Sequence, residues 1–140
     1  MVEHIATSAV HHVRLTVTDT NRAREFFTGL LGFQAVGELP AGVAGPASAV
    51  LLHNGTTLLV LSPAPERPIS GDRFDPNRVG LDHLSLSVAS RDALEQAVRL
   101  FDQRGIQHGP IVEYAAFKIS VLPFHGPDDI QLELTAPHEA

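Results

Sequence analysis

The feature that most constrains this chain is an internal repeat, in which two halves carry the same order of patterns. Apolar and polar residues alternate from His12 to Val17 and again from His83 to Val88, 71 positions later. Near the end of each half, residues 59–62 (LVLS) match residues 132–135 (LELT), 73 positions later. A nearly constant offset indicates two copies of one β-α-β-β-β unit that fold together, not a solenoid.

In the first half, alternation with a period of two predicts a strand over residues 11–17. A cluster of N-cap residues follows at 18–21, and helical spacing then predicts a helix that ends before Gly32. Two more strands are predicted at 49–52 and 57–62, joined by a hairpin turn.

The second half repeats this order. The strand is predicted over residues 81–88, and the helix begins after Ser90 and ends at Gly105. Three strand-like stretches follow, at residues 111–114, 117–122 and 130–135.

Domain boundaries follow from the repeat. The first module covers about residues 10–62 and the second about 81–137, with a proline-rich linker or flap at 63–80. Residues 37–47 are rich in Gly, Pro and Ala and are predicted to form a loop. Since neither half is long enough to form a stable domain by itself, the 140 residues are expected to form one domain, residues 1–140, with a shared core.

Strand parity places three residues that can bind a metal on the polar faces of their strands. Side chains alternate across a strand, so His12, His83 and Glu133 lie on the polar face while their apolar neighbours face the helices. If the sheets curl so that this face is concave, the three side chains converge as the two-histidine, one-carboxylate set of non-haem iron sites. Alternatively, polar residues on strands simply face water.

Composition excludes several classes of function. The absence of cysteine rules out a disulfide framework, a thiolate nucleophile and a zinc–thiolate site. A net charge of −6 with scattered basic residues argues against nucleic acid as a partner. Uncharged apolar runs such as residues 58–61 are too short to span a membrane, and a cytoplasmic location is expected.

Three segments in order, HHVRLTVTDTNRAREFFTGLLGF, LDHLSLSV and GPDDIQLELTAP, resemble the vicinal oxygen chelate superfamily, which groups glyoxalase, bleomycin-resistance and dioxygenase proteins. The last segment has Gly126–Asp129 where the family usually has a DPDG turn. The resemblance implies an α+β fold in which two β-α-β-β-β modules form a cupped mixed β-sheet. It also implies a homodimer, with modules commonly paired across a two-fold axis.

The same resemblance implies the metal ligands, which come from the first and last strands of each module. These positions are His12, Val60, His83 and Glu133. Valine cannot bind a metal, so the remaining His-His-Glu set is similar to that of extradiol dioxygenases and fosfomycin-type thiol transferases. Fe(II) or Mn(II) is the favoured cofactor, with Ni, Co or Zn as possible substitutes. Open coordination positions would accept a small metabolite with adjacent oxygens.

Further side chains of the predicted cup are candidates for other roles. Acid–base candidates lie near the ends of predicted strands: His53, Tyr114 and His125. Substrate-binding candidates share the polar face with the metal ligands: Arg14, Ser85 and Gln131. For Arg14, an ion pair with an anionic substrate and a structural salt bridge inside the cup are equally compatible with the sequence.

The expected function is therefore a metal-dependent enzyme of dioxygenase or transferase type, acting on a small oxygen-chelating metabolite. Three alternatives remain at this stage: a non-catalytic antibiotic-binding protein of the bleomycin-resistance type, a glyoxalase-type lyase or isomerase, and a metal-free member of the family. The low aromatic content and the absence of Trp argue against a drug-binding groove built on aromatic stacking.

Overall fold

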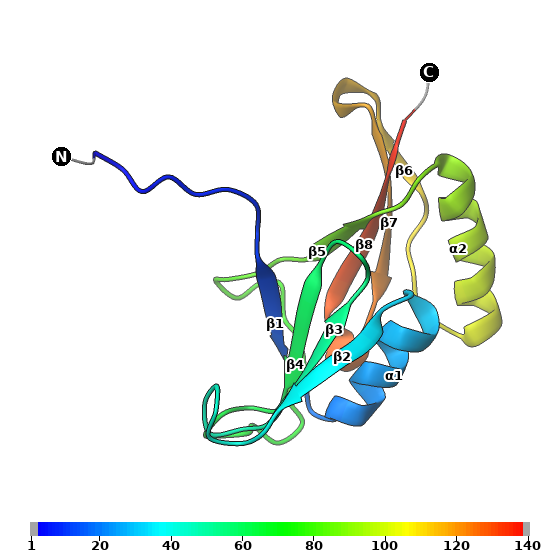
Figure 1. Cartoon of the computed structure of the whole chain (residues 1–140). Helices are drawn as coiled ribbons and strands as arrows, with labels where there is room; N and C mark the ends of the chain where they lie inside the picture. Colours follow the sequence, from blue (N-terminus) through cyan, green and yellow to red (C-terminus); the bar gives the residue numbers. More distant parts are fainter. Residues whose placement is uncertain (1–2, 139–140) are drawn as a thin grey trace. The chain divides into compact units, whose positions relative to one another are not determined.

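The computed structural model describes residues 3–138 and divides the chain into two compact units, Met1–Asp72 and Arg73–Ala140. The division falls inside the predicted linker at residues 63–80. Each unit contains a four-stranded mixed sheet with one α-helix against it (Figure 1). Within the described residues, no helix is long and apolar enough to cross a membrane.

The first unit has the predicted β-α-β-β-β order. Its elements are β1 (His12–Thr16), α1 (Thr20–Leu30), β2 (Gln34–Leu39), β3 (Ala49–His53) and β4 (Leu58–Ser62). The sheet order is β1-β4-β3-β2, and β1 pairs with β4 in parallel while the other neighbours are antiparallel. Residues 3–11 run away from β1 as an extended arm (Figure 1).

Local signals explain where α1 begins and ends. The Asp19 side chain accepts a hydrogen bond from the backbone N–H of Arg22 at 3.1 Å, which caps the helix. At the other end Gly32 adopts φ +73°, the left-handed conformation that ends a helix at low cost in glycine. The buried ring of Phe27 then meets that of Phe33 edge to face, with ring centroids 5.8 Å apart, and packs the helix against the core.

The second unit repeats the plan with two short 3₁₀ turns added. Its elements are β5 (Leu84–Ser87), α2 (Arg91–Arg104), β6 (Val112–Tyr114), η1 (Ala115–Phe117), β7 (Ile119–His125), η2 (Pro127–Asp129) and β8 (Gln131–Pro137). The sheet order is β5-β8-β7-β6, and β5 pairs with β8 in parallel.

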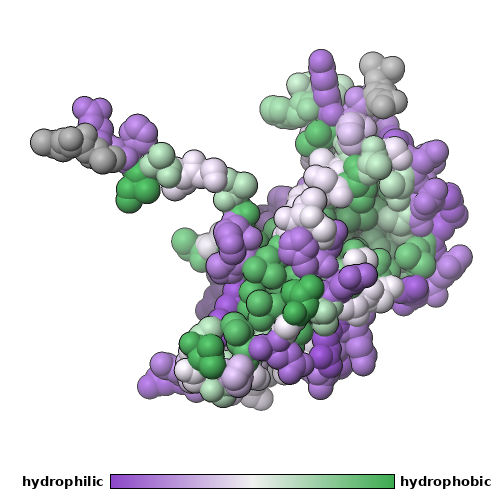
Figure 2. Space-filling view, viewed as in Figure 1, coloured by the Kyte–Doolittle hydropathy of each residue, from purple (hydrophilic) through white to green (hydrophobic). Residues whose placement is uncertain are grey.

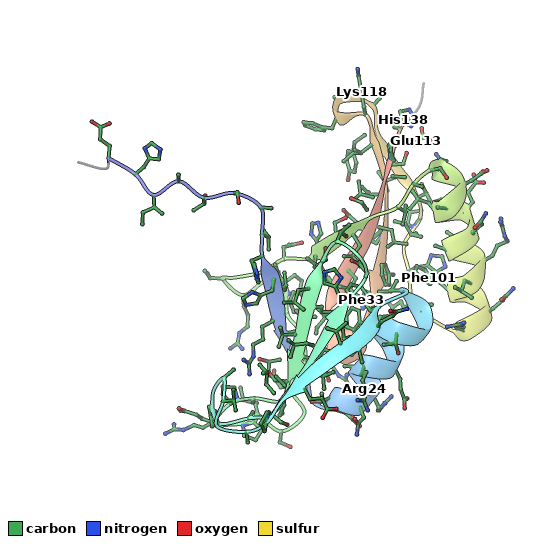
Figure 3. The ribbon with its side chains drawn as sticks, in the orientation of Figure 1. Arg24, Phe33, Phe101, Glu113, Lys118 and His138 are labelled. Carbon is green, nitrogen blue, oxygen red and sulfur yellow. The ribbon has the colours of Figure 1, made fainter. Side chains whose placement is uncertain are left out.

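The α2 helix has the caps that the sequence predicts. The Ser90 hydroxyl accepts a hydrogen bond from the backbone N–H of Ala93 at 3.3 Å, and Gly105 ends the helix at φ +67°. The helix is held to its sheet by Phe101, whose ring lies 4.6 Å from that of Phe124 (Figure 3). Both rings are almost fully buried.

One strand was missed in the first half. Residues 34–39 form β2, so the prediction of a loop from residue 37 is wrong, and the chain leaves the sheet only after Leu39. The side chains of β2 are almost all exposed, so no apolar alternation marks the strand, and its pairing with β3 shifts register between Ala35 and Gly37. This edge strand is therefore defined by its backbone hydrogen bonds to β3, which leave no pattern of buried side chains in the sequence.

Two boundaries in the second half also differ from prediction. The strand predicted at residues 81–88 begins at Leu84, so His83 directly precedes β5 instead of lying within it. The strand predicted at residues 117–122 is β7, which begins at Ile119 and continues through Pro123 to His125. Proline is tolerated there because the pairing of β6 with β7 stops at Val121.

A hydrogen-bonded histidine ties the segment after α2 to the helix. His108 Nε2 lies 2.7 Å from Asp102 Oδ1, and Nδ1 lies 2.7 Å from the Gly109 carbonyl oxygen. Carboxylate and carbonyl oxygens only accept, so both contacts are satisfied as hydrogen bonds when both ring nitrogens carry protons. The hydrogen bond to Asp102, followed by that to Gly109, raises the pKa of His108 above its usual 6.5.

This pKa shift predicts a pH-dependent contribution to stability. A raised folded-state pKa means that the stabilisation is complete below about pH 6.5 and is lost as the pH rises through the folded-state value. We expect His108→Gln to lower the free energy of unfolding in mildly acidic buffer and to have little effect in alkaline buffer. Urea titrations over this range test the prediction, with His4→Gln on the exposed arm as control. Equal losses at all pH values would contradict it.

Core packing of the second unit generates a second prediction. Leu122 on β7 is fully buried against the helix side of the sheet. Leu122→Ala should lower the free energy of unfolding by about 2–5 kcal/mol, because transfer energy and cavity cost add. Val43→Ala, at a side chain that is 63% exposed, should change it by less than about 0.5 kcal/mol. Chemical denaturation measures both, and similar losses in the two variants would contradict the assigned core.

Candidate functional site

The polar face of the second sheet collects the candidate side chains. Strands β5 and β8 pair with Ser85 opposite Glu133, while β7 and β8 pair with His125 opposite Gln131. The residues on the other face of β8, Leu132 and Leu134, are buried. The prediction from parity is therefore confirmed for β8, whose polar side chains face away from α2.

His83 is held between two carboxylates at the start of β5. Its Nδ1 lies 2.7 Å from Asp82 Oδ1, and its Nε2 lies 3.6 Å from Glu133 Oε1. Because the Asp82 carboxylate only accepts, Nδ1 carries a proton, and Nε2 is the ring nitrogen on the side of Glu133. A carboxylate behind an imidazole is the arrangement that orients histidines which bind metals.

Glu133 is the less exposed member of this pair, at 18% against 44% for His83. Its Oε1 accepts a hydrogen bond from the Thr135 hydroxyl at 3.3 Å. That hydroxyl in turn lies 2.5 Å from the Ser85 hydroxyl on the neighbouring strand. The carboxylate is thus oriented by a short polar chain along the same face of the sheet.

A cavity of about 460 Å³ lies over this end of the second sheet. Its polar lining includes Asp82, His83, His125, Gln131 and Glu133. The segment 107–109 forms another part of the wall, held to β7 by backbone hydrogen bonds. A volume in this range suits a small molecule, with the polar groups to orient it.

The corresponding face of the first unit differs in character. His12, Arg14 and Thr16 are exposed along β1. Val60 lies opposite Arg14 in the pairing of β1 with β4, the same relation that Glu133 has to Ser85, and is only 6% exposed. Figure 2 shows hydrophobic residues gathered over β3 and β4. An apolar side chain therefore occupies the position that corresponds to the carboxylate of the second unit.

Arg14 has two neutral partners in the first unit. Its Nε donates to the hydroxyl of the buried Ser62 at 3.0 Å, and Nη1 donates to the Ala44 carbonyl at 3.1 Å. These contacts fix the guanidinium beside β4 without neutralising its charge. The structural role visible within residues 3–138 is thus hydrogen bonding to the loop and to β4.

His12 and the three acid–base candidates have different surroundings. His12 Nδ1 lies 2.9 Å from His11 Nδ1, so its Nε2 lies outside this contact. His53 Nδ1 accepts the backbone N–H of Gly55 at 2.9 Å and helps to shape the hairpin turn. Tyr114 is 47% exposed on β6, away from the cavity lining. Of the acid–base candidates, His125 lines the cavity together with His83 and Glu133.

No three His, Asp or Glu side chains meet in a metal-binding arrangement within residues 3–138. Of the predicted metal ligands, His83 and Glu133 are brought together in the second unit, and His12 belongs to the first. Sequence reasoning missed Asp82 and the wall at 107–109. Asp82 could have been found from the sequence, because an acidic residue directly precedes the predicted histidine ligand. The wall at 107–109 could not, because it depends on backbone hydrogen bonds to β7.

Known proteins share the fold of this chain. A curated relative, the uncharacterized protein YwkD of Bacillus subtilis, is 29% identical over 126 residues, which cover 90% of this chain and 94% of that protein. A glyoxylase/bleomycin resistance protein/dioxygenase domain from Frankia sp. EAN1pec superposes with a TM-score of 0.81 at 28% identity, covering 95% of this chain and 100% of that one.

More distant structures show the fold alone. The fosfomycin resistance protein FosX from Listeria monocytogenes, in complex with Mn(II) and sulfate, has a TM-score of 0.68 at 13% identity, with 94% of this chain and 93% of that chain covered. TnmS3, an antibiotic binding protein from Streptomyces sp. CB03234, has a TM-score of 0.66 at 21% identity, with 96% and 99% covered.

A family profile described as the Glyoxalase/Bleomycin resistance protein/Dioxygenase superfamily matches residues 9–134, nearly the whole repeat. The two β-α-β-β-β units, the two sheets and the solved structures that share them agree with this match. The chain belongs to the glyoxalase/bleomycin resistance protein/dioxygenase superfamily, which is the vicinal oxygen chelate superfamily that its sequence resembles.

Proposed function

We propose that this protein is a divalent-metal-dependent enzyme that acts on a small oxygen-chelating metabolite, with chemistry of the dioxygenase or transferase type. The observation that carries the proposal is the His83–Glu133 pair, whose Nε2 and Oε1 atoms lie 3.6 Å apart on the wall of a cavity. The FosX structure, which contains Mn(II), is consistent with a metal-dependent member of this fold.

The chemistry of the donor set fits a divalent cation. Neutral imidazole nitrogen and carboxylate oxygen are ligands that Mn(II) and Fe(II) accept, and Ni, Co and Zn also bind them. With its proton held on Nδ1 by Asp82, a neutral His83 ring would offer Nε2 to a cation on the same side as the Oε1 atom of Glu133. A bound cation lowers the pKa of a coordinated hydroxyl and stabilises negative charge on oxygen.

The remaining assignments belong to the same proposal. His12 is the third protein ligand, supplied by this chain or by a second copy in a homodimer. Arg14, Ser85 and Gln131 contact the substrate: Arg14 offers a charged donor to an anionic group, and the other two offer neutral hydrogen-bonding groups. Gln131 supports this role because it lines the same cavity as His83. A cytoplasmic location is part of the proposal.

The main competing function is non-catalytic binding of a small molecule such as an antibiotic. It is favoured by the cavity of about 460 Å³, which suffices for ligand binding without a metal. The antibiotic binding protein TnmS3 shares the fold, which is consistent with this second candidate. Metal content separates the two functions.

Removal of the paired side chains should abolish metal binding. We expect His83→Ala and Glu133→Gln each to weaken Mn(II) affinity by more than about 100-fold, since each removes a direct ligand. Asp82→Ala should cost about 10- to 100-fold because it only orients His83. Isothermal titration of chelator-treated protein with Mn(II) and Fe(II) measures these affinities.

The matched control is His4→Ala, which removes an exposed histidine of the N-terminal arm. It should bind metal as the wild type does. If the wild type and His83→Ala both retain equally little metal after reconstitution, the metalloenzyme proposal fails and the binding protein takes its place.

Substitution of Val60 tests whether the site favours dioxygenase or transferase chemistry over lyase chemistry. Valine leaves free the position where a fourth protein ligand would bind, and we therefore expect negligible lactoylglutathione lyase activity. Val60→Glu should tighten divalent-metal binding by about tenfold, or 1.4 kcal/mol, while it blocks an open coordination position. Its apo form should be less stable, because the substituted side chain is only 6% exposed.

The control for Val60→Glu is Thr16→Glu, which adds a carboxylate at an exposed position on the neighbouring strand β1, on the same face of the sheet. Metal titration and lyase assays compare the two variants with the wild type. If Thr16→Glu and Val60→Glu change metal affinity equally, a general charge effect explains the gain and Val60 has no special place at the site.

A further inference from the structure

The cavity of the second unit contains a second histidine, His125, whose two ring nitrogens differ in environment. Nδ1 is shielded from solvent and has no hydrogen-bond partner among the described residues. The side chain as a whole is 36% exposed and lines the cavity with His83 and Glu133. The accessible edge of the ring is therefore the one that carries Nε2.

A carboxylate faces the shielded nitrogen. Asp129 Oδ1 lies 3.9 Å from His125 Nδ1, and the other oxygen, Oδ2, lies 3.7 Å from Arg73 Nε. A carboxylate oxygen only accepts, so this neighbour favours the tautomer that carries its proton on Nδ1. A movement of about 1 Å would bring the two atoms within hydrogen-bond distance.

The backbone at Asp129 lies in a conformation that glycine adopts most easily. Its φ is +60°, and that of the preceding Asp128 is +57°, so both lie in the left-handed region. Glycine occupies this region without a steric cost, and aspartate adopts it more often than most other residues do. At Asp129 this conformation carries a carboxylate whose Oδ1 lies on the side of His125 Nδ1.

We propose that Asp129 is a positioning residue that holds His125 as the Nδ1–H tautomer, and that His125 Nε2 accepts a proton from a hydroxyl group of the ligand in the cavity. The O–H bond breaks with its electron pair left on oxygen, and an N–H bond forms at Nε2. The resulting imidazolium faces the Asp129 carboxylate, which offsets its charge. The ligand class is a small chelating molecule that carries an ionisable hydroxyl beside a second oxygen. This inference rests on the proposed metal-dependent function.

The tautomer is measured directly by two-bond ¹H–¹⁵N correlation spectra of ¹⁵N-histidine-labelled protein at mildly alkaline pH. We expect the Nδ1–H form for His125 in the wild type and a shift toward the Nε2–H form in Asp129→Gly. Asp128→Gly is the matched control, since it relieves the neighbouring left-handed residue and leaves the Asp129 carboxylate in place. An Nε2–H form in the wild type, or no change in Asp129→Gly, overturns the inference.

Proton acceptance is tested with 4-nitrocatechol, a chelator whose visible spectrum reports the ionisation of its hydroxyl groups, added to Mn(II)-loaded protein. At the same pH, His125→Phe should bind the probe with one more proton than the wild type does. An identical spectrum overturns the inference while leaving metal binding intact. If the wild type binds no Mn(II), the proposed function fails by itself, and the tautomer spectra alone decide the role of Asp129.

Discussion

Parallel pairing between the first and last strand of each unit is the constraint on which the rest of the structure depends. The β1–β4 and β5–β8 pairs place residues that are far apart in sequence in fixed register, and each helix crosses back to cover one face. Because side chains alternate, one register decides every face at once. It buries Leu132 and Leu134 on the helix side and leaves Glu133 beside Ser85 on the other.

The two units have diverged on this shared frame. In the first unit the polar face of β1 lies next to the apolar strand β4, with Val60 opposite Arg14. The second places Glu133 opposite Ser85 and adds Asp82, His83 and the cavity. At the equivalent register position the first unit has the apolar Val60 and the second has the carboxylate of Glu133.

The second unit gathers charged groups that orient one another. Asp82 orients His83, Thr135 orients Glu133, and Asp129 faces His125. His108 differs from these residues because both its nitrogens lie at hydrogen-bond distance from oxygen acceptors, which raises its pKa and favours the protonated ring. The proposed chemistry therefore falls to His83, Glu133 and His125, whose accessible atoms face the cavity.

The sequence by itself determined the duplication, both helices with their caps, the apolar faces of the strands and the family, because these follow from periodicity and local backbone preference. The sequence did not predict strand β2, because an exposed edge strand is defined by backbone pairing and carries no apolar alternation. Only the tertiary structure decided that His83 lies 3.6 Å from Glu133, or that His125 and the segment 107–109 share their cavity. Those relations depend on register between strands distant in sequence, and parity predicts the face of a residue but not its distance from another.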